Sequence, residues 1–111
     1  MIRDDLIEKL GIDPLDIEST AMGQAGCDIY LARKAREDYF HYGVESKFQE
    51  SLNIWSALKQ CEDNAAKEKL TPMLVFRRSR SKNYAVVEWD EMLRILKENN
   101  DLKASIKKKK G

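Results

Sequence analysis

The residues whose types and spacing best suit chemistry are two carboxylates and a lysine, Asp28, Glu45 and Lys47. They fall in residues 27–31 and 41–48, where polar and apolar side chains alternate as they do in half-buried β-strands. Since alternate residues share one face of a strand, Glu45 and Lys47 are neighbours, and Asp28 faces away from the apolar side of its own segment. If the two segments pair, the three charged groups meet in one patch.

Such a patch predicts a divalent cation, because two carboxylates held close together repel each other unless a positive charge lies between them. Mg²⁺ prefers oxygen ligands and binds through one or two carboxylates plus a substrate phosphate, so Asp28 and Glu45 are its candidate ligands. Lys47 adds a compact cation that can position a water molecule or neutralise a phosphate. A Glu-x-Lys pair alone is more often a solvated strand face, and that interpretation stays open.

The elements that must position these residues follow from hydrophobic periodicity and from turn residues. Helices are predicted over residues 2–10, 51–69 and from 90 onwards, and strands over 15–20, 27–31, 41–48, 72–77 and 84–89. Residues 21–26 are expected to form a loop, and residues 32–40 a helical turn or a long connection. This order predicts an α/β fold with a mixed β-sheet flanked by α-helices.

Side-chain patterns within these elements predict which residues face the core. The inward set comprises Tyr42, Val44, Phe48, Ile54, Leu58, Cys61, Ala65, Met92, Leu93, Ile95 and Leu96. Ser51 is the expected N-cap of the long helix. An uncharged polar stripe beside the apolar face of that helix contains Asn53, Ser56, Gln60 and Asn64, and it borders either a cleft or ordinary surface. Trp55 and Trp89 are expected in the core or in a subunit interface.

Two basic segments stand out from a nearly neutral chain. Arg77, Arg78, Arg80 and Lys82 cluster at the predicted turn between residues 72–77 and 84–89. Clustered guanidinium groups predict a clamp on a phosphate backbone, and the alternative is a solubilising turn. Residues 103–111 are expected to form a frayed basic tail after a single domain over residues 1–102.

Composition narrows the remaining classes of protein. The chain has 111 residues and a net charge of +1, so a nucleic-acid contact must come from local clustering rather than bulk charge. It has no apolar run long enough to cross a bilayer, and we expect no membrane partner. Its two cysteines are far apart and predict no zinc site. A cytoplasmic protein with reduced thiols is the expectation.

Three stretches of the sequence resemble a known family. Asp28 followed by Glu45-Ser46-Lys47 looks like the signature of the PD-(D/E)xK nuclease superfamily. More narrowly, residues 19–29, 44–55 and 74–87 are similar to phage-encoded Holliday junction resolvase-like endonucleases. The likeness covers roughly residues 15–97 and would place the protein in DNA recombination, in the host cytoplasm if it is phage-encoded.

The resemblance implies a restriction-endonuclease-like fold that cuts DNA phosphodiester bonds with Mg²⁺, or Mn²⁺ as a substitute, as a homodimer. Carried over by position, Asp28, Glu45 and the Ser46 carbonyl are the metal ligands and Lys47 is the catalytic lysine. The family's further glutamate on the first helix has no clean match. Glu8 and Glu18 are the candidates to replace it, and Glu18, Ser19 and Gln60 are the accessory site residues.

The preferred interpretation is thus a metal-dependent endonuclease acting on Holliday junctions or other branched DNA. Two alternatives remain open. One is a nuclease of the same fold that nicks DNA or cuts plain duplex. The other is a DNA-binding module that keeps the fold but has lost full activity.

Overall fold

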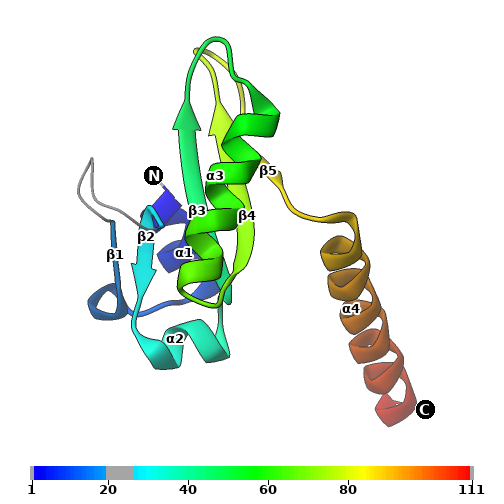
Figure 1. Cartoon of the computed structure of the whole chain (residues 1–111). Helices are drawn as coiled ribbons and strands as arrows, with labels where there is room; N and C mark the ends of the chain where they lie inside the picture. Colours follow the sequence, from blue (N-terminus) through cyan, green and yellow to red (C-terminus); the bar gives the residue numbers. More distant parts are fainter. Residues whose placement is uncertain (1, 20–26, 111) are drawn as a thin grey trace.

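The computed structural model describes residues 2–19 and 27–110, so the predicted loop at 21–26 lies outside the described residues. Helix α1 (Ile2–Leu10) and a 3₁₀ turn (Pro14–Asp16) precede strands β1 (Ile17–Ser19) and β2 (Ile29–Leu31). Then come α2 (Arg33–Asp38), β3 (Tyr42–Phe48), α3 (Ile54–Lys67), β4 (Thr71–Arg77), β5 (Tyr84–Val86) and α4 (Trp89–Lys110). The α/β class predicted from the sequence is confirmed (Figure 1).

The central sheet has the strand order β3-β4-β5. Strands β3 and β4 are parallel, with Lys47 opposite Phe76, and α3 makes the crossover that a parallel pair requires. Strand β5 returns antiparallel to β4 after the basic turn. Strands β1 and β2 form a separate antiparallel pair, and the backbone amide of Asp28 donates to the carbonyl of Val44 at 2.8 Å, which brings the end of this pair against β3.

One core cluster lies on the side of the N-terminal elements. Leu6, Ile17, Ile29, Leu31 and Val44 bury their side chains together there. Helix α1 ends as predicted beside a glycine: Gly11 has φ +70°, and its amide donates to the carbonyl of Ile7. The predicted strand over 15–20 begins instead with the 3₁₀ turn at Pro14–Asp16, because the Asp13 side chain accepts the amide of Leu15 and holds the chain in a turn.

The second cluster fills the space between α3 and the opposite face of the sheet, where Figure 1 shows α3 lying along β3 and β4. Ala57, Cys61 and Ala65 are the buried residues of α3, and Leu74 meets them from β4. The inward face therefore centres on small residues, and predicted Ile54 and Leu58 lie at its margin. The N-cap is Asn53, whose side chain accepts the amide of Ser56, and not Ser51 as predicted.

Phe48 does not face the core as predicted. It is the last residue of β3 and is 55% exposed, because the packed layer ends before it and its ring lies under the Arg77 guanidinium instead. Trp55 and Trp89 are 81% and 72% exposed in this single chain, so neither is a core residue.

Helix α4 differs most from expectation. It runs to Lys110 with no frayed tail from residue 103, and Figure 1 shows it projecting from the body of the protein. Met92, Leu93 and Leu96, predicted to face inward, are 39–47% exposed. Its first turn is held to β3, because Tyr42 donates to Glu91 and Glu91 also pairs with Arg94. None of the helices among the described residues is long and apolar enough to cross a membrane.

Candidate metal-binding site

Asp28 is fixed against β3 by two hydrogen bonds of different kinds. Its backbone amide donates to the Val44 carbonyl, and its side-chain Oδ2 accepts the amide of Ser46 at 2.6 Å. The carboxylate thus takes the amide that the next rung of a β-ladder would have used. These two bonds position both the backbone and the carboxylate of Asp28 next to Glu45, the residue before Ser46.

Glu45 is a buried carboxylate, only 5% exposed. It lies opposite Leu74, on the sheet face covered by α3, where Asn64 Nδ2 donates to its Oε2 at 3.3 Å. Burial raises the pKa of Glu45, and the nearby charge of Asp28 raises it further, while Asn64 and Lys47 act in the opposite direction. The predicted proximity of the two carboxylates is therefore present in the fold.

Lys47 shares this face of β3. Its Nζ lies 3.6 Å from Glu45 Oε1, and its side chain is 21% exposed, so the ammonium stands at the boundary between the buried carboxylate and solvent. Because a residue's amide and carbonyl point to the same edge of a strand, the Ser46 carbonyl faces the edge at which Asp28 accepts the Ser46 amide. Two carboxylates, one carbonyl and one ammonium thus gather around Glu45-Ser46-Lys47.

These groups fit a hard divalent cation. Repulsion from Asp28 adds to burial in raising the pKa of Glu45, and a bound cation would offset that repulsion. The atoms available to bind a metal ion are all oxygen atoms. Within the described ranges, no three His, Cys, Asp or Glu side chains converge to hold a metal ion. The site therefore offers two carboxylates and a backbone oxygen, a set that leaves room for water and phosphate as Mg²⁺ prefers.

Gln60 does not contact the cluster directly but lies close to a residue that does. It is exposed on α3, and with Asn64 it lines an open hollow of about 510 Å³. Asn64, which bonds to Glu45, was predicted from the sequence only as part of a polar stripe. Asn64 could be noticed in the sequence because it lies one helical turn after Gln60, beside the apolar face of the helix. The pattern alone did not identify Glu45 as its hydrogen-bond partner.

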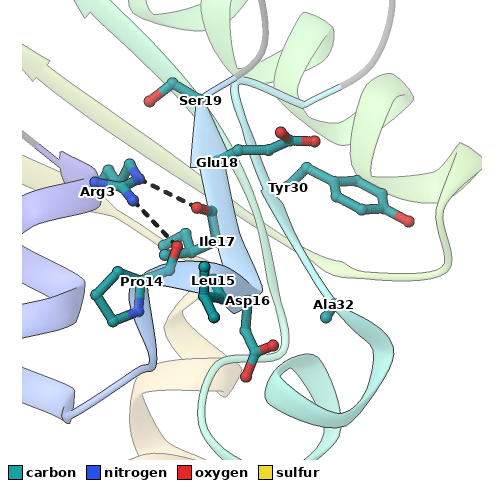
Figure 2. Close-up of a pocket in the computed structure, with 9 residues that line it drawn as sticks. All are labelled: Arg3, Pro14, Leu15, Asp16, Ile17, Glu18, Ser19, Tyr30 and Ala32. Carbon is teal, nitrogen blue, oxygen red and sulfur yellow. Dashed lines mark hydrogen bonds between the residues drawn. The ribbon is translucent and has the colours of Figure 1, made fainter.

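Glu18 and Ser19 line a different hollow, about 470 Å³ in volume, on the β1–β2 side (Figure 2). Glu18 pairs with Tyr30 across the two strands, and Figure 2 shows both side chains extending to the same side while Ser19 points away from them. Arg3 closes one wall by donating to the carbonyls of Pro14 and Ile17. Both accessory candidates are exposed, and Glu8 is also exposed, on α1.

The basic turn connects β4 to β5 and is held by its own hydrogen bonds. Ser81 Oγ accepts the amide of Arg78, and Glu50 accepts the amide of Ser79 from the loop after β3. None of the cations Arg77, Arg78, Arg80 and Lys82 has a carboxylate within ion-pair distance in the part of the chain that the structure describes. The turn therefore presents clustered positive charge whose nearest acidic neighbour, Glu50, is engaged with the backbone.

Comparison of the chain with protein-family models, with curated proteins and with solved structures found no match.

Proposed function

We propose that this protein is a Mg²⁺-dependent endonuclease that hydrolyses DNA phosphodiester bonds, with Holliday junctions or other branched DNA as its substrate. The observation that carries the proposal is the Asp28–Ser46 hydrogen bond, which fixes one carboxylate beside the buried Glu45. The crossover of α3 between parallel β3 and β4 is compatible with the restriction-endonuclease-like fold that the sequence resemblance implies.

Each residue of the cluster then has one task. Asp28, Glu45 and the Ser46 carbonyl hold the cation, and Mn²⁺ is the expected substitute for Mg²⁺. When bound, Mg²⁺ neutralises phosphate charge and lowers the pKa of water. Lys47 holds its ammonium beside Glu45, where it orients the attacking water or stabilises charge on the phosphate. Asn64 is a positioning residue, because it fixes the Glu45 carboxylate from the opposite side.

The basic turn supplies affinity rather than chemistry. Arg77, Arg78, Arg80 and Lys82 contact backbone phosphates, and the counterions released make binding salt-dependent. The slope of log K against log salt is negative, and it becomes about 0.9 shallower for each phosphate contact that a substitution removes from duplex binding. Arg78→Ala and Arg80→Ala together are therefore expected to flatten this slope, whichever DNA sequence is used.

A homodimer is the proposed assembly, with α4 as the contact surface. Met92, Ile95, Asn99, Leu102 and Ile106 follow the 3-4 spacing of a coiled-coil seam. Leu102 and Ile106 are more than half exposed in the single chain, and a polar Asn within a seam favours a defined register.

The charges beside this seam suit a parallel second copy. Glu98 and Lys103 occupy the g and e positions five residues apart, so each lies near its opposite charge on the partner, and Glu98 also pairs with Arg94 within its own helix. Light scattering after gel filtration is expected to give a dimer for the native chain and a monomer for Leu102→Lys. Lys97→Ala, outside the seam on the same helix, is the matched control. A dimer that persists in Leu102→Lys would remove α4 from the interface.

Cutting assays on a labelled four-way junction, a nicked duplex and a plain duplex, with and without Mg²⁺, test the nuclease itself. Asp28→Asn and Lys47→Ala are expected to lower the cutting rate by roughly 100-fold or more, while Lys97→Ala leaves it unchanged. Cutting that survives both substitutions would place the chemistry elsewhere.

The same assays separate the rival functions. Equal cutting of plain or nicked duplex would indicate a nuclease of the same fold with another substrate. A DNA-binding module without catalysis is favoured by one observation, that no third acidic side chain joins the pair among the residues described. Binding without cutting in Mg²⁺ and in Mn²⁺ would establish that alternative.

A further inference from the structure

A hollow of about 350 Å³ lies at the end of β3 and β4, between the loop after β3 and the basic turn. Its lining includes Leu52 from the loop before α3, Ile54 from the start of α3, and Phe76 and Tyr84 from the sheet. Apolar walls beside an exposed aromatic ring and a cation are the features that bind a planar ring carrying a phosphate.

The aromatic wall is already a stacked pair. The rings of Phe76 and Tyr84 have centroids 6.1 Å apart and planes inclined by 29°. Tyr84 is 56% exposed, so a large part of its side chain remains accessible beyond this contact. An exposed aromatic ring on a rigid strand is what single-stranded nucleic acids use as a stacking platform, because every base has a flat apolar face.

The cationic side of the hollow is Arg78, which lines it directly after β4. The Arg77 guanidinium lies on the other face of the sheet, 4.3 Å from the centroid of Phe48, its partner in register. Glu50 lines the hollow as well, but one of its oxygens accepts the Ser79 amide, so the acidic group is engaged with the loop backbone.

The hollow is placed correctly with respect to the metal-binding cluster. Lys47 lies opposite Phe76, and Phe76 lies opposite Tyr84. Partners in register point to the same side of a sheet, so Tyr84 shares a face with Lys47 and, two residues earlier, with Glu45. Two strand spacings separate Lys47 from Tyr84, about 10 Å. Because α3 covers this face, a DNA strand would reach both places around the start of α3 rather than across the sheet.

We infer that this hollow binds an unpaired nucleobase of a DNA strand, stacked on Tyr84 with its phosphate at Arg78. The inference rests on the proposed function and narrows its substrate class to DNA with unpaired bases near the cut. A fully paired duplex keeps its bases in the helical stack and cannot place one there without breaking a pair. The basic turn then grips the flanking backbone.

Fluorescence anisotropy tests the inference with the full chain in EDTA, so that cutting does not enter. The probes are a labelled 15-nucleotide oligo-dT and a labelled blunt 15-base-pair duplex. Tyr84→Ala is expected to weaken oligo-dT binding about 5- to 150-fold, the range of one lost base stack, and to leave duplex binding within about twofold. Tyr84→Phe should retain oligo-dT affinity because it keeps the ring. Tyr39→Ala is the matched control, since Tyr39 is 59% exposed beside α2.

The outcomes separate this inference from the proposed function. Equal loss for both probes, or no loss for oligo-dT, overturns the stacking site whatever the cutting assays give. A selective loss supports it even if no DNA is cut in Mg²⁺, in which case the nuclease proposal fails alone. A thermal melt of each variant identifies unfolding, and Tyr84→Trp, which keeps a stacking ring, must then bind oligo-dT as the native chain does.

Discussion

Replacing Gly43 with alanine adds one methyl group and tests how closely β3 packs against α3 and Cys27. Gly43 lies in β3, two residues before Glu45, beneath α3 and beside the segment that carries Asp28. A Cβ at this position would come within 2.8 Å of Ala65 Cβ and of Cys27 Sγ, and within 3.0 Å of Ala65 Cα. Ala65 and Cys27 are 0% and 3% exposed, so neither has free space into which to move.

Gly43→Ala is therefore expected to destabilise the protein by about 1–3 kcal/mol, the range for an extra methyl group in a packed core. For a domain of this size each 1 kcal/mol corresponds to roughly 4 °C in Tm. The same displacement should impair cutting in the molecules that stay folded. Cys27 precedes Asp28 directly, and a shift of Cys27 lengthens the 2.6 Å hydrogen bond between Asp28 and the Ser46 amide.

Urea unfolding followed by circular dichroism measures the first effect, and cutting well below the Tm measures the second. Adding Cys27→Ala to Gly43→Ala removes one of the two closest contacts, so the pair should show a favourable coupling of about 0.5–3 kcal/mol. Leu102→Ala, on the projecting α4, should instead be additive within about 0.5 kcal/mol. A Gly43→Ala variant as stable as the native chain would refute the close packing of β3, Cys27 and α3.

Three further predictions concern ionisable groups. In EDTA, Glu45→Gln should be more stable than the native chain at neutral pH, and the difference should vanish in acid. Burial and Asp28 raise the native-state pKa of Glu45, so its ionisation destabilises the fold as pH rises. Urea titrations at several pH values check this. Glu91 behaves in the opposite way, because Arg94 and Tyr42 lower its pKa to about 2. The stability that Glu91 contributes is therefore lost as pH falls from about 4.5 towards 2, and the difference in stability between the native chain and Glu91→Gln should close over that window. A constant difference would contradict the lowered pKa of Glu91. Burial raises the pKa of Cys27 to about 12, and Cys61 is likewise buried, so a thiol reagent at pH 8 should label these cysteines only after denaturation.

Local patterns predicted the strands that carry the candidate site, because alternation is a property of the sequence itself. Residues 41–48 correspond to β3, and residues 27–31 contain β2 with Cys27, Ile29 and Leu31 buried as predicted. The pattern placed Asp28 near Glu45 only on the condition that the two segments pair. The sequence pattern could not predict the hydrogen bond from the Ser46 amide to Asp28. That bond depends on which edge of β3 residues 27–31 lie against.

Long-range packing explains the errors in α4. Its 3.6-residue periodicity identified an apolar side, but periodicity does not say what covers that side. Glu91 in the first turn bonds to Tyr42 in the body of the protein, and Leu96 and Leu102 further along α4 are exposed. The same amphipathic pattern that predicted a helix packed on the sheet thus describes a surface suited to a second chain.

Small residues connect the packing of the fold to the electrostatics of the site. Gly43 on β3 and Ala65 on α3 allow the helix to approach the strand closely, and that approach removes water from the Glu45 carboxylate. Burial makes the charged form of this carboxylate costly and Asp28 adds repulsion, so its pKa is raised even with Lys47 and Asn64 beside it. The same carboxylate has more to gain from a cation than an exposed one would, because attraction between charges is stronger where water is excluded. Larger side chains at Gly43 or Ala65 would lift α3, rehydrate Glu45 and so weaken the proposed cation binding without altering any of the proposed ligands.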